Sequence, residues 1–220
     1  MSRARIINLS TSFNEAVETA ADVLLNNKII IYPTDTLYGL GGNALSEKVI
    51  RKVFEIKKRN RKKPLPIIVE DLKMARRAAC INFKAERILE KIWSADSRNK
   101  IGPVTAVLRK KDIVPYSLTA GGETVALRPA GSLFLKALFQ KIDFPLIATS
   151  ANLSDQPAIN KISKITKTFK NSGCLVIDNG DLKNAAPSVI IDLSNINYPK
   201  ILRSGERSKE KLFEIFEILG

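Results

Sequence analysis

The sequence predicts a single α/β domain over residues 1–220, in which helices flank a twisted, mixed β-sheet. Two observations predict this class. Short β-branched segments bounded by proline or glycine alternate with segments whose apolar residues recur at helical spacing. In addition, 220 residues with 45% apolar content can bury the core of one large domain.

The first predicted elements are a helix and a buried strand. Ser12 and Glu15 have the spacing of a capping box, and apolar residues then recur at helical intervals as far as Leu24. The segment KIIIYPT at 28–34 is short, β-branched and stopped by proline, so it predicts a strand. The loop PTDTLYGLGG at 33–42 follows, and its glycines favour either a turn with positive φ or a contact with phosphate.

A second helix is predicted from the candidate cap Ser46 to Lys57, because apolar residues again recur at helical spacing. A basic run, Lys57–Lys63, then begins, in which six of seven side chains are cationic. Positive charge complements the dipole at a helix C-terminus. The basic run is therefore either a solvated helix end or part of an anion-binding site.

The remaining elements alternate along the chain. Strands are expected at 64–70, 103–110, 123–129, 145–150, 174–179, 188–193 and 200–204. Helices are expected at 72–79, 84–93, 132–140, 160–170 and 208–219, with Ser132 and Ser208 as candidate caps.

Composition limits the possible functions. A formal charge of +14, from 36 Lys and Arg against 22 Asp and Glu, favours RNA, DNA or nucleotides as partners, with solvated lysines as the alternative. The sequence has no histidine, which excludes Ser-His-Asp and Cys-His catalysis and His-ligated zinc. No protein-ligated metal site is expected. Cys80 and Cys174 match no metal-ligand spacing and predict buried thiols in a reducing compartment.

Localisation follows from the absence of targeting signals. The first twenty residues contain no apolar core of a signal peptide, and no apolar run is long enough to span a membrane. We therefore expect a cytoplasmic protein with no membrane partner.

Loops at the predicted strand ends carry hydroxyls, amides and arginines, and ligands of α/β sheets tend to bind at such ends. TSAN at 149–152 is one, with an Asx turn or helix cap as its structural alternative. Arg128 and Arg203 each end an apolar strand, where a guanidinium has either a ligand anion or a structural ion pair.

Seven segments together resemble the YrdC-domain family, the threonylcarbamoyl-AMP synthases, in order and spacing from about residue 10 to 207. The segments are YPTDTLYGLGGNAL, IKKRNRKKPL, GPVTAVL, TVALRPA, PLIATSANLS, PSVIIDL and ILRSGE. The most specific marks are the Lys-x-Arg of Lys57 to Arg59 and the Ser-x-Asn of Ser150 to Asn152. The resemblance implies a YrdC-like fold around a large, basic concave cavity.

The resemblance also implies a nucleotidyltransferase. Family members convert L-threonine, bicarbonate and ATP into threonylcarbamoyl-AMP and pyrophosphate. A threonylcarbamoyl-transferase complex then modifies the adenosine beside the anticodon of tRNA. Mg²⁺ is expected to arrive with ATP. Because both reactants are anions, such an enzyme must neutralise their charge, align the attack on phosphorus and exclude water, and it needs no covalent nucleophile.

Roles carry over by motif. Arg59 and Lys63 would hold ATP phosphates, and Lys57 would line the same wall, with Lys57 and Arg59 as the catalytic pair. The other implied nucleotide contacts are Thr124, Ser150, Asn152 and Arg203. The implied threonine contacts are Thr36, Arg128, which would bind the carboxylate, and Ser188.

The sequence departs from the family pattern in several places. Ile68 stands where many longer relatives have a histidine that helps hold threonine, and RPAG lacks another histidine. Asp155 replaces a frequent glycine, and Val189 a frequent threonine. The chain stops soon after LRSG, as in the short single-domain form. The resemblance thus supports nucleotide binding more strongly than threonine specificity.

Two other functions remain open at this stage. One is a non-catalytic paralogue that binds tRNA or double-stranded RNA through the basic concavity, with an affinity that falls steeply with salt. The other is a domain that adenylates carbamoyl from carbamoyl phosphate. Such domains normally lie inside long hydrogenase-maturation proteins with cysteine-rich partners, and this sequence has neither feature.

Overall fold

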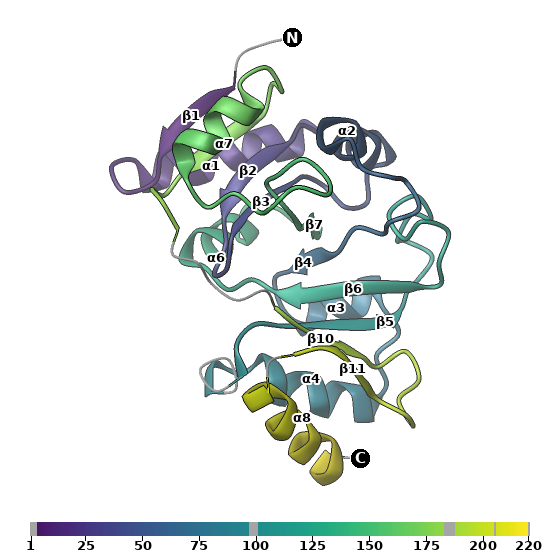
Figure 1. The fold of residues 1–220 in the computed structure, drawn as a ribbon. Helices are drawn as coiled ribbons and strands as arrows, with labels where there is room; N and C mark the ends of the chain where they lie inside the picture. Colours follow the sequence, from purple (N-terminus) through teal and green to yellow (C-terminus); the bar gives the residue numbers. More distant parts are fainter. Residues whose placement is uncertain (1–3, 97–100, 183–187, 205, 220) are drawn as a thin grey trace.

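Two mixed β-sheets form the frame of the structure (Figure 1). The computed structural model describes residues 4–96, 101–182, 188–204 and 206–219. The first sheet has the strand order β1-β9-β2-β3-β8, and the second sheet has the order β11-β10-β5-β6-β4-β7. The single sheet predicted from the sequence is therefore divided in two, because residue patterns locate strands without showing which of them pair.

Both sheets combine parallel and antiparallel pairs. In the first sheet β9 is parallel to β1 and β2, whereas β3 is antiparallel to β2 and β8. In the second sheet β10 is parallel to β5, and β4 is parallel to β6. The strands are β1 Arg5–Asn8, β2 Ile30–Pro33, β3 Tyr38–Gly41, β4 Ile67–Val69, β5 Val104–Arg109, β6 Thr124–Pro129, β7 Leu146–Ile147, β8 Thr149–Ser150, β9 Leu175–Asp178, β10 Val189–Asp192 and β11 Lys200–Arg203.

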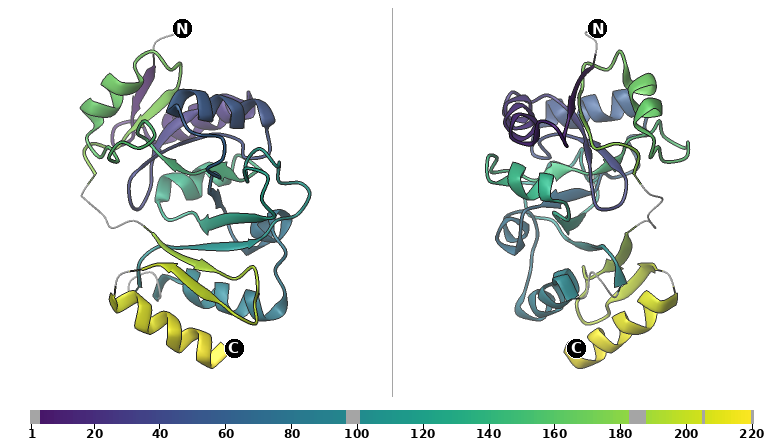
Figure 2. Two further views of the ribbon diagram at one scale, coloured as in Figure 1. Left: turned by 45° about the vertical axis from the view of Figure 1, so that its right-hand side comes forward. Right: turned by 90° about the vertical axis from the view of Figure 1, so that its left-hand side faces the viewer.

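The helices cover the outer surfaces of this frame. α1 packs on β1, β2, β9 and α6 at one end of the molecule, and α4 packs on β5 and α8 at the other end (Figure 2). Their positions agree with the predicted helices to within one or two residues at most ends. The helices are α1 Phe13–Leu25, α2 Glu47–Lys57, α3 Leu72–Ala78, α4 Phe83–Trp93, α6 Leu133–Phe139, α7 Ile162–Phe169 and α8 Glu206–Leu219.

The predicted helix caps are only partly correct. Ser132 accepts a hydrogen bond from the amide of Leu135, as a cap should. Ser12 and Ser46 precede their helices but make no side-chain cap bond. Ser208 lies inside α8, where its hydroxyl donates to the carbonyl of Ile101 at 3.1 Å. Ser208 thus connects α8 to the segment before β5 instead of starting the helix.

Strand β3 was predicted as a loop because it contains glycine. None of the three glycines 39, 41 and 42 has a positive φ, so the expected turn is wrong. A Cβ on Gly41 would collide with the backbone carbonyl of Ile147, and one on Gly39 would press on the Tyr32 ring. These glycines permit close packing of backbone, which is the other role of glycine in a strand.

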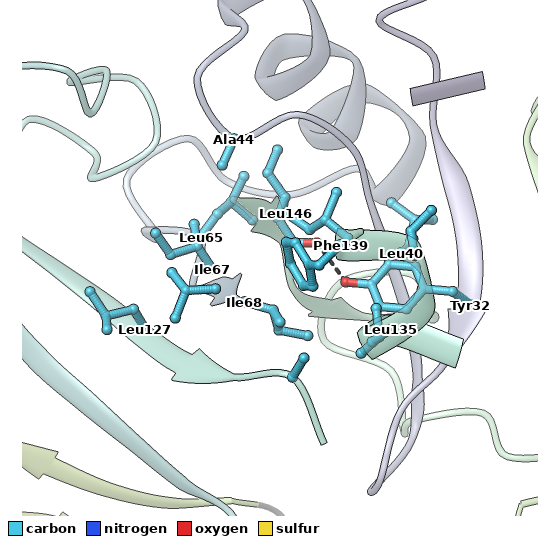
Figure 3. Packing of buried hydrophobic residues seen from close by; sticks show 14 of the residues in the cluster. Tyr32, Leu40, Ala44, Leu65, Ile67, Ile68, Leu127, Leu135, Phe139 and Leu146 are labelled. Atoms are coloured by element: carbon cyan, nitrogen blue, oxygen red, sulfur yellow. Dashed lines mark hydrogen bonds between the residues drawn. The ribbon is translucent and has the colours of Figure 1, made fainter. Parts of the chain in front are cut away.

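The core lies between the sheets and their helices. Tyr32 is fully buried near Leu40, Leu135 and Phe139, and its hydroxyl donates to the Ile147 carbonyl at 2.8 Å (Figure 3). This bond satisfies the one polar atom that the ring brings into the core. Cys174 is buried as expected, but Cys80 is exposed.

No helix in the described part of the chain is both long and apolar enough to cross a membrane.

Candidate functional site

A cavity of about 540 Å³ lies between the two sheets. Its floor is one face of the second sheet, because residues at alternate positions of a strand share a face. Thr105 and Val107 of β5 lie on this floor together with Thr124, Ala126 and Arg128 of β6. The intervening residues of these strands face the core. The floor is therefore a mixed surface of hydroxyls, small apolar groups and one cation.

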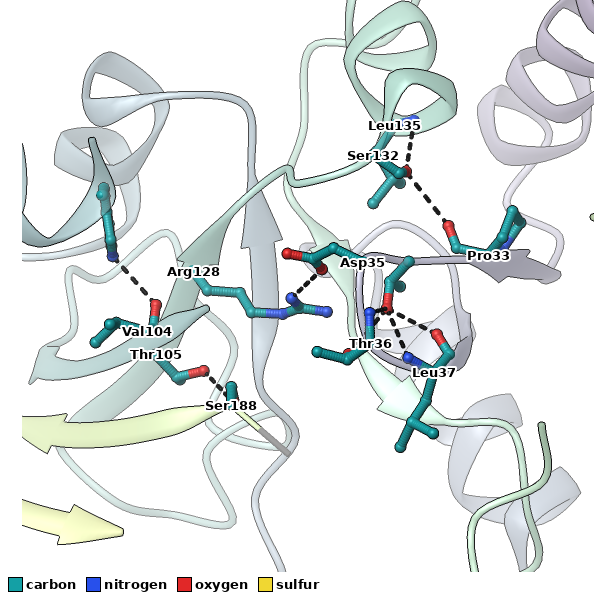
Figure 4. A network of polar contacts seen from close by, with 12 residues as sticks. Pro33, Asp35, Thr36, Leu37, Val104, Thr105, Arg128, Ser132, Leu135 and Ser188 are labelled. Carbon is teal, nitrogen blue, oxygen red and sulfur yellow. Dashed lines mark hydrogen bonds and ion pairs between the residues drawn. The ribbon is translucent and has the colours of Figure 1, made fainter. Parts of the chain in front are cut away.

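The β2–β3 turn forms the opposite wall. The Thr34 hydroxyl donates to the Leu37 carbonyl at 2.7 Å and accepts from the amides of Thr36 and Leu37 (Figure 4). The Thr36 hydroxyl lies 3.0 Å from the Thr34 hydroxyl and lines the cavity, where a ligand could contact it.

Arg128 crosses the space between the sheets to meet this turn (Figure 4). Its Nη1 donates to Oδ1 of Asp35 at 2.6 Å, and the two side chains are only 11% and 15% exposed. The structural ion pair considered from the sequence is thus present. A guanidinium has five N–H donors, so Arg128 can also bind a second carboxylate.

Ser188 and Arg203 form a second pair of polar residues in contact, after Arg128 and Asp35. The hydroxyls of Ser188 and Thr105 are 3.0 Å apart. Arg203 donates from Nε and Nη2 to the Ser188 carbonyl at 3.0 and 2.8 Å. Both Ser188 and Arg203 line the cavity. The preceding motif residues 186 and 187 lie outside the described residues.

Arg59 is the residue of the basic run that lines the cavity. Its Nη2 donates to the Pro64 carbonyl at 2.9 Å and its Nε to the Lys63 carbonyl at 3.3 Å. Burial lowers the pKa of Arg59, and the negative charge of Asp155 opposes that shift. The loop 59–64 thus orients its own arginine toward the space between the sheets.

Lys57 does not line the cavity, so this part of the prediction is wrong. Its side chain is 1% exposed and reaches Ser150 and Asn152 from behind. The ammonium donates to both backbone carbonyls, to Asn152 at 2.7 Å, and to Asn152 Oδ1 at 3.0 Å. Burial, with the charge of Arg59, lowers the pKa of Lys57 to about 7. Although burial favours the neutral amine, these three oxygen acceptors match the three N–H donors of the protonated Lys57 ammonium.

Asn152 is also turned away from the cavity, while Ser150 lines it. The Asn152 Oδ1 accepts from both Lys57 and the Ser150 hydroxyl, and its Nδ2 donates to the Gln156 carbonyl. Asn152 is 8% exposed and is occupied with holding its own loop. Of Ser150 and Asn152, only Ser150 therefore lines the cavity, and its nucleotide contact stays a prediction.

Lys63 lies outside the cavity lining and is paired. Its Nζ is 2.7 Å from Oδ1 of Asp155, and both side chains are largely exposed. The hydrogen bond from Lys63 and its charge lower the pKa of Asp155. Asp155 has φ of 63°, a conformation that glycine adopts at little cost.

Two of the departures from the family pattern, Ile68 and Val189, do not reach the cavity. Ile68 is fully buried in the core, and its neighbour Ile67 lines the cavity instead. Val189 is likewise buried, and the residues on either side of it, Ser188 and Ile190, line the cavity. Strand alternation explains both results, since adjacent side chains point to opposite faces.

The cavity thus brings together most of the predicted site. Seven predicted residues line it: Thr36, Arg59, Thr124, Arg128, Ser150, Ser188 and Arg203. The sequence analysis missed Thr34, Asp35 and Thr105, of which Thr34 and Thr105 line the cavity and Asp35 pairs with Arg128 beside it. The first two lie in the PTDT segment that had been noted, and Thr105 interrupts the apolar strand GPVTAVL on the same face as Val107.

The side chains of the cavity are those of a protein that binds anionic ligands. The cavity lining within the described residues contains arginines and hydroxyls but no carboxylate, and no cluster of three potential metal ligands is found there. Such a site binds anions and can stabilise negative charge in a transition state.

Comparison with known proteins then places the chain in a family. It belongs to the Sua5/YciO/YrdC family, whose model, described as telomere recombination, matches residues 22–205. The predicted family is therefore confirmed.

Two relatives and one solved structure illustrate the similarity. The threonylcarbamoyl-AMP synthase of Pyrococcus abyssi is 33% identical over 98% of this chain, which spans 61% of that protein. The Haemophilus influenzae enzyme of the same name is 31% identical, over 80% of this chain and 93% of its own length. The structure of Pyrococcus abyssi Sua5 complexed with L-threonine has a TM-score of 0.81 and 29% identity, covering 94% of this chain and 60% of its own.

Proposed function

We propose that this chain is a threonylcarbamoyl-AMP synthase, a nucleotidyltransferase that uses L-threonine, bicarbonate and ATP. One observation carries the proposal: motif residues from distant parts of the sequence, Thr36, Arg59, Arg128, Ser150 and Ser188, line one cavity. The names of its relatives, and the solved complex of one of them with L-threonine, support the same activity.

The reaction brings two anions together. Threonine and bicarbonate first give a carbamate with loss of water. A carbamate oxygen then attacks the α-phosphorus of ATP, and the bond to pyrophosphate breaks. Arg59 and Arg203 would neutralise charge as the anions approach, and arginine suits this task because it can bind phosphate with two parallel hydrogen bonds. The half-enclosed space between the sheets would limit attack by water on the mixed anhydride.

The end of the cavity near Arg128 would bind the amino acid. Arg128 would bind the carboxylate with donors that Asp35 does not use. The Thr36 and Ser188 hydroxyls, which line the cavity, would contact the polar groups of threonine. None of these interactions would require a side chain at Ile68, so the proposed threonine site does not depend on the missing histidine.

The other end would bind the nucleotide. Thr124 and Arg59 would supply donors, and the Ser150 hydroxyl, whose proton is given to Asn152, would supply lone pairs. Leu65, Ile67 and Ile190 would supply apolar surface for a base. Lys63 would reach phosphate only after leaving Asp155. We further propose that Mg²⁺ arrives with ATP, because hydroxyls and cations suit phosphate better than they suit a metal ion. When bound, it would neutralise phosphate charge.

The product would pass to a threonylcarbamoyl-transferase complex that modifies tRNA. Direct contact with tRNA remains a prediction. Lys58, Arg61 and Lys62 of the basic run are exposed and lie outside the cavity lining, so they are available for such contact.

Product identification by mass spectrometry tests the proposal. Folded protein with ATP, Mg²⁺, bicarbonate and threonine should form threonylcarbamoyl-AMP and pyrophosphate. Arg59→Ala and Arg128→Ala should each lower the rate by about 10²-fold or more, since each removes a charged contact to an anion. Arg61→Ala, in the same basic run but outside the cavity lining, is the matched control. Full activity of either site variant would contradict its assigned role.

A further inference from the structure

We propose that Thr105 is a positioning residue for the substrate, which acts by holding the Ser188 hydroxyl in place on the cavity floor. This inference rests on the proposed function, because it concerns the amino acid that would occupy that end of the cavity. Thr105 is not among the threonine and nucleotide contacts that the family motifs imply. The inference therefore adds a residue to the site and says what that residue does.

The register of the second sheet places Thr105 between the two floor residues proposed to bind threonine. β10 runs parallel to β5 with Ile190 beside Thr105, and Ser188 lies two residues before Ile190 on the same face. On the other side, β6 is antiparallel to β5, and its register carried one residue further brings Arg128 opposite Thr105. Thr105 thus lies between Ser188 and Arg128, and all three line the cavity (Figure 4).

The Thr105 hydroxyl is buried and meets Ser188. Thr105 is only 5% exposed, and its Oγ1 lies 3.0 Å from the Ser188 Oγ. A buried hydroxyl that loses its partner costs free energy, which favours keeping this contact. Threonine is also β-branched, so its side chain has less rotational freedom than that of serine. The stiffer, more buried hydroxyl of Thr105 therefore restrains that of Ser188, which is half-buried.

Ser188 is held at two points by two different residues. It immediately precedes β10, and Arg203 donates to its backbone carbonyl from Nε and Nη2. The same Nη2 is 3.4 Å from the Ser188 Oγ, a longer contact than the 3.0 Å to Thr105. Arg203 thus fixes the backbone of Ser188, and Thr105 fixes its side chain.

A restrained Ser188 hydroxyl would favour amino-acid binding, because its rotational freedom would be lost before the ligand arrives. Arg128 would bind the carboxylate, and Ser188 would contact a second polar group of the same molecule. Thr105 would keep these two contacts at a fixed separation across the floor. The implied nucleotide contact Thr124 lies four residues from Arg128 along β6, so ATP should depend little on Thr105.

Steady-state kinetics of threonine-dependent pyrophosphate release tests the inference. Thr105→Val keeps the branched shape, suits a strand and removes only the hydroxyl. The KM for threonine should rise by about three- to tenfold, the size of one neutral hydrogen bond. The KM for ATP and kcat should change by less than about twofold. Thr105→Ser restores the hydroxyl and should recover most of the threonine KM.

A double variant shows whether Thr105 acts through Ser188. In a Ser188→Ala background, Thr105→Val should raise the threonine KM no further, because the hydroxyl that Thr105 holds is already gone. Thr166→Val is the matched control. Thr166 belongs to α7 outside the cavity lining, and its hydroxyl donates to the Ser163 carbonyl. This control should leave all three kinetic constants unchanged.

Three results would overturn the inference: an unchanged threonine KM in Thr105→Val, equal increases in the KM for threonine and for ATP, or additive effects in the double variant. Each of these would leave the synthase activity itself in place. If the natural protein released no pyrophosphate with threonine, the proposed function would fail first and this inference with it.

Discussion

Lys57 donates hydrogen bonds to both oxygens of Asn152, at 2.7 Å to the backbone carbonyl and at 3.0 Å to Oδ1. The two motifs that mark this family most specifically are thus joined from behind the cavity. The residues of the basic run differ in their surroundings, since Lys58, Arg61 and Lys62 are exposed. Lys57 supports a loop, Arg59 lines the cavity, and Lys63 pairs with Asp155.

Replacing Lys57 with methionine tests its role as a positioning residue. Lys57→Met keeps much of the side-chain volume but removes the Lys57 hydrogen bonds to three oxygens, of which the Ser150 carbonyl and Asn152 Oδ1 each keep one other donor. We expect a loss of about 2–4 kcal/mol in the free energy of unfolding. We also expect roughly 10²-fold lower activity, because the Ser150 loop would shift.

Chemical denaturation and turnover measured together would show both effects. Lys58→Met changes the next, exposed lysine and should leave both quantities near those of the natural protein. Activity lost in Lys57→Met without any loss of stability would contradict the supporting role and favour direct catalysis.

The lowered pKa of Lys57 predicts a dependence of stability on pH. The pKa of Lys57 is about 7 in the folded protein, and its ordinary value is 10.5. Between these two pH values the unfolded chain holds a proton that the folded chain has released. Stability due to Lys57 therefore rises with pH in this window and is lowest below pH 7, where a charged ammonium is buried.

Thermal melts of the natural protein and Lys57→Met across this window would detect the effect. The stability difference between them should grow by at most about 1.4 kcal/mol per pH unit. A constant difference would mean that the three oxygen acceptors keep the ammonium protonated.

Asp155→Gly should be nearly neutral for folding. Glycine fits the positive φ, which favours the variant, while the lost ion pair is exposed to water and therefore contributes little to stability. If Lys63 binds phosphate, its release should tighten ATP binding by roughly two- to fivefold at low salt. The gain should vanish at high salt. Calorimetry with ATP at two salt concentrations measures this gain in affinity. Weaker ATP binding by Asp155→Gly would show that Asp155 holds Lys63 in position for phosphate instead of competing with phosphate for it.

Gly41→Ala should destabilise the fold through backbone contact. The added Cβ would strike the Ile147 carbonyl, which cannot move without disturbing both sheets, so we expect a loss of about 1–3 kcal/mol or more. Gly122→Ala is the control, since its Cβ would lie 3.2 Å from the Thr119 carbonyl in a loop. Urea unfolding curves with equal midpoints for the two variants would show that β3 can shift.

Periodic apolar residues made most of the fold predictable. The helices and longer strands were located because their patterns are strong, whereas β1 was missed. Its four residues alternate only weakly, with Ile7 alone buried. Strand β3 was missed because glycine is rare in strands, and the close approach that requires it is visible only in three dimensions.

The membership of the site was more predictable than its geometry. Motifs identified the lining residues, but lysine is almost never fully buried, so no pattern indicated that Lys57 would lie behind the cavity. Its partners are more than ninety residues away. The pairing of Asp35 with Arg128 was hidden for the same reason, since it joins two sheets whose arrangement the sequence does not encode locally.

The most direct test of the proposed activity is the incorporation of labelled bicarbonate into a nucleotide product. Purified protein, ATP and Mg²⁺ would be incubated with threonine, serine, glycine or no amino acid. We predict a labelled threonylcarbamoyl-AMP that requires threonine. No labelled product with any amino acid, from protein shown to be folded, would contradict the synthase and favour the RNA-binding alternative.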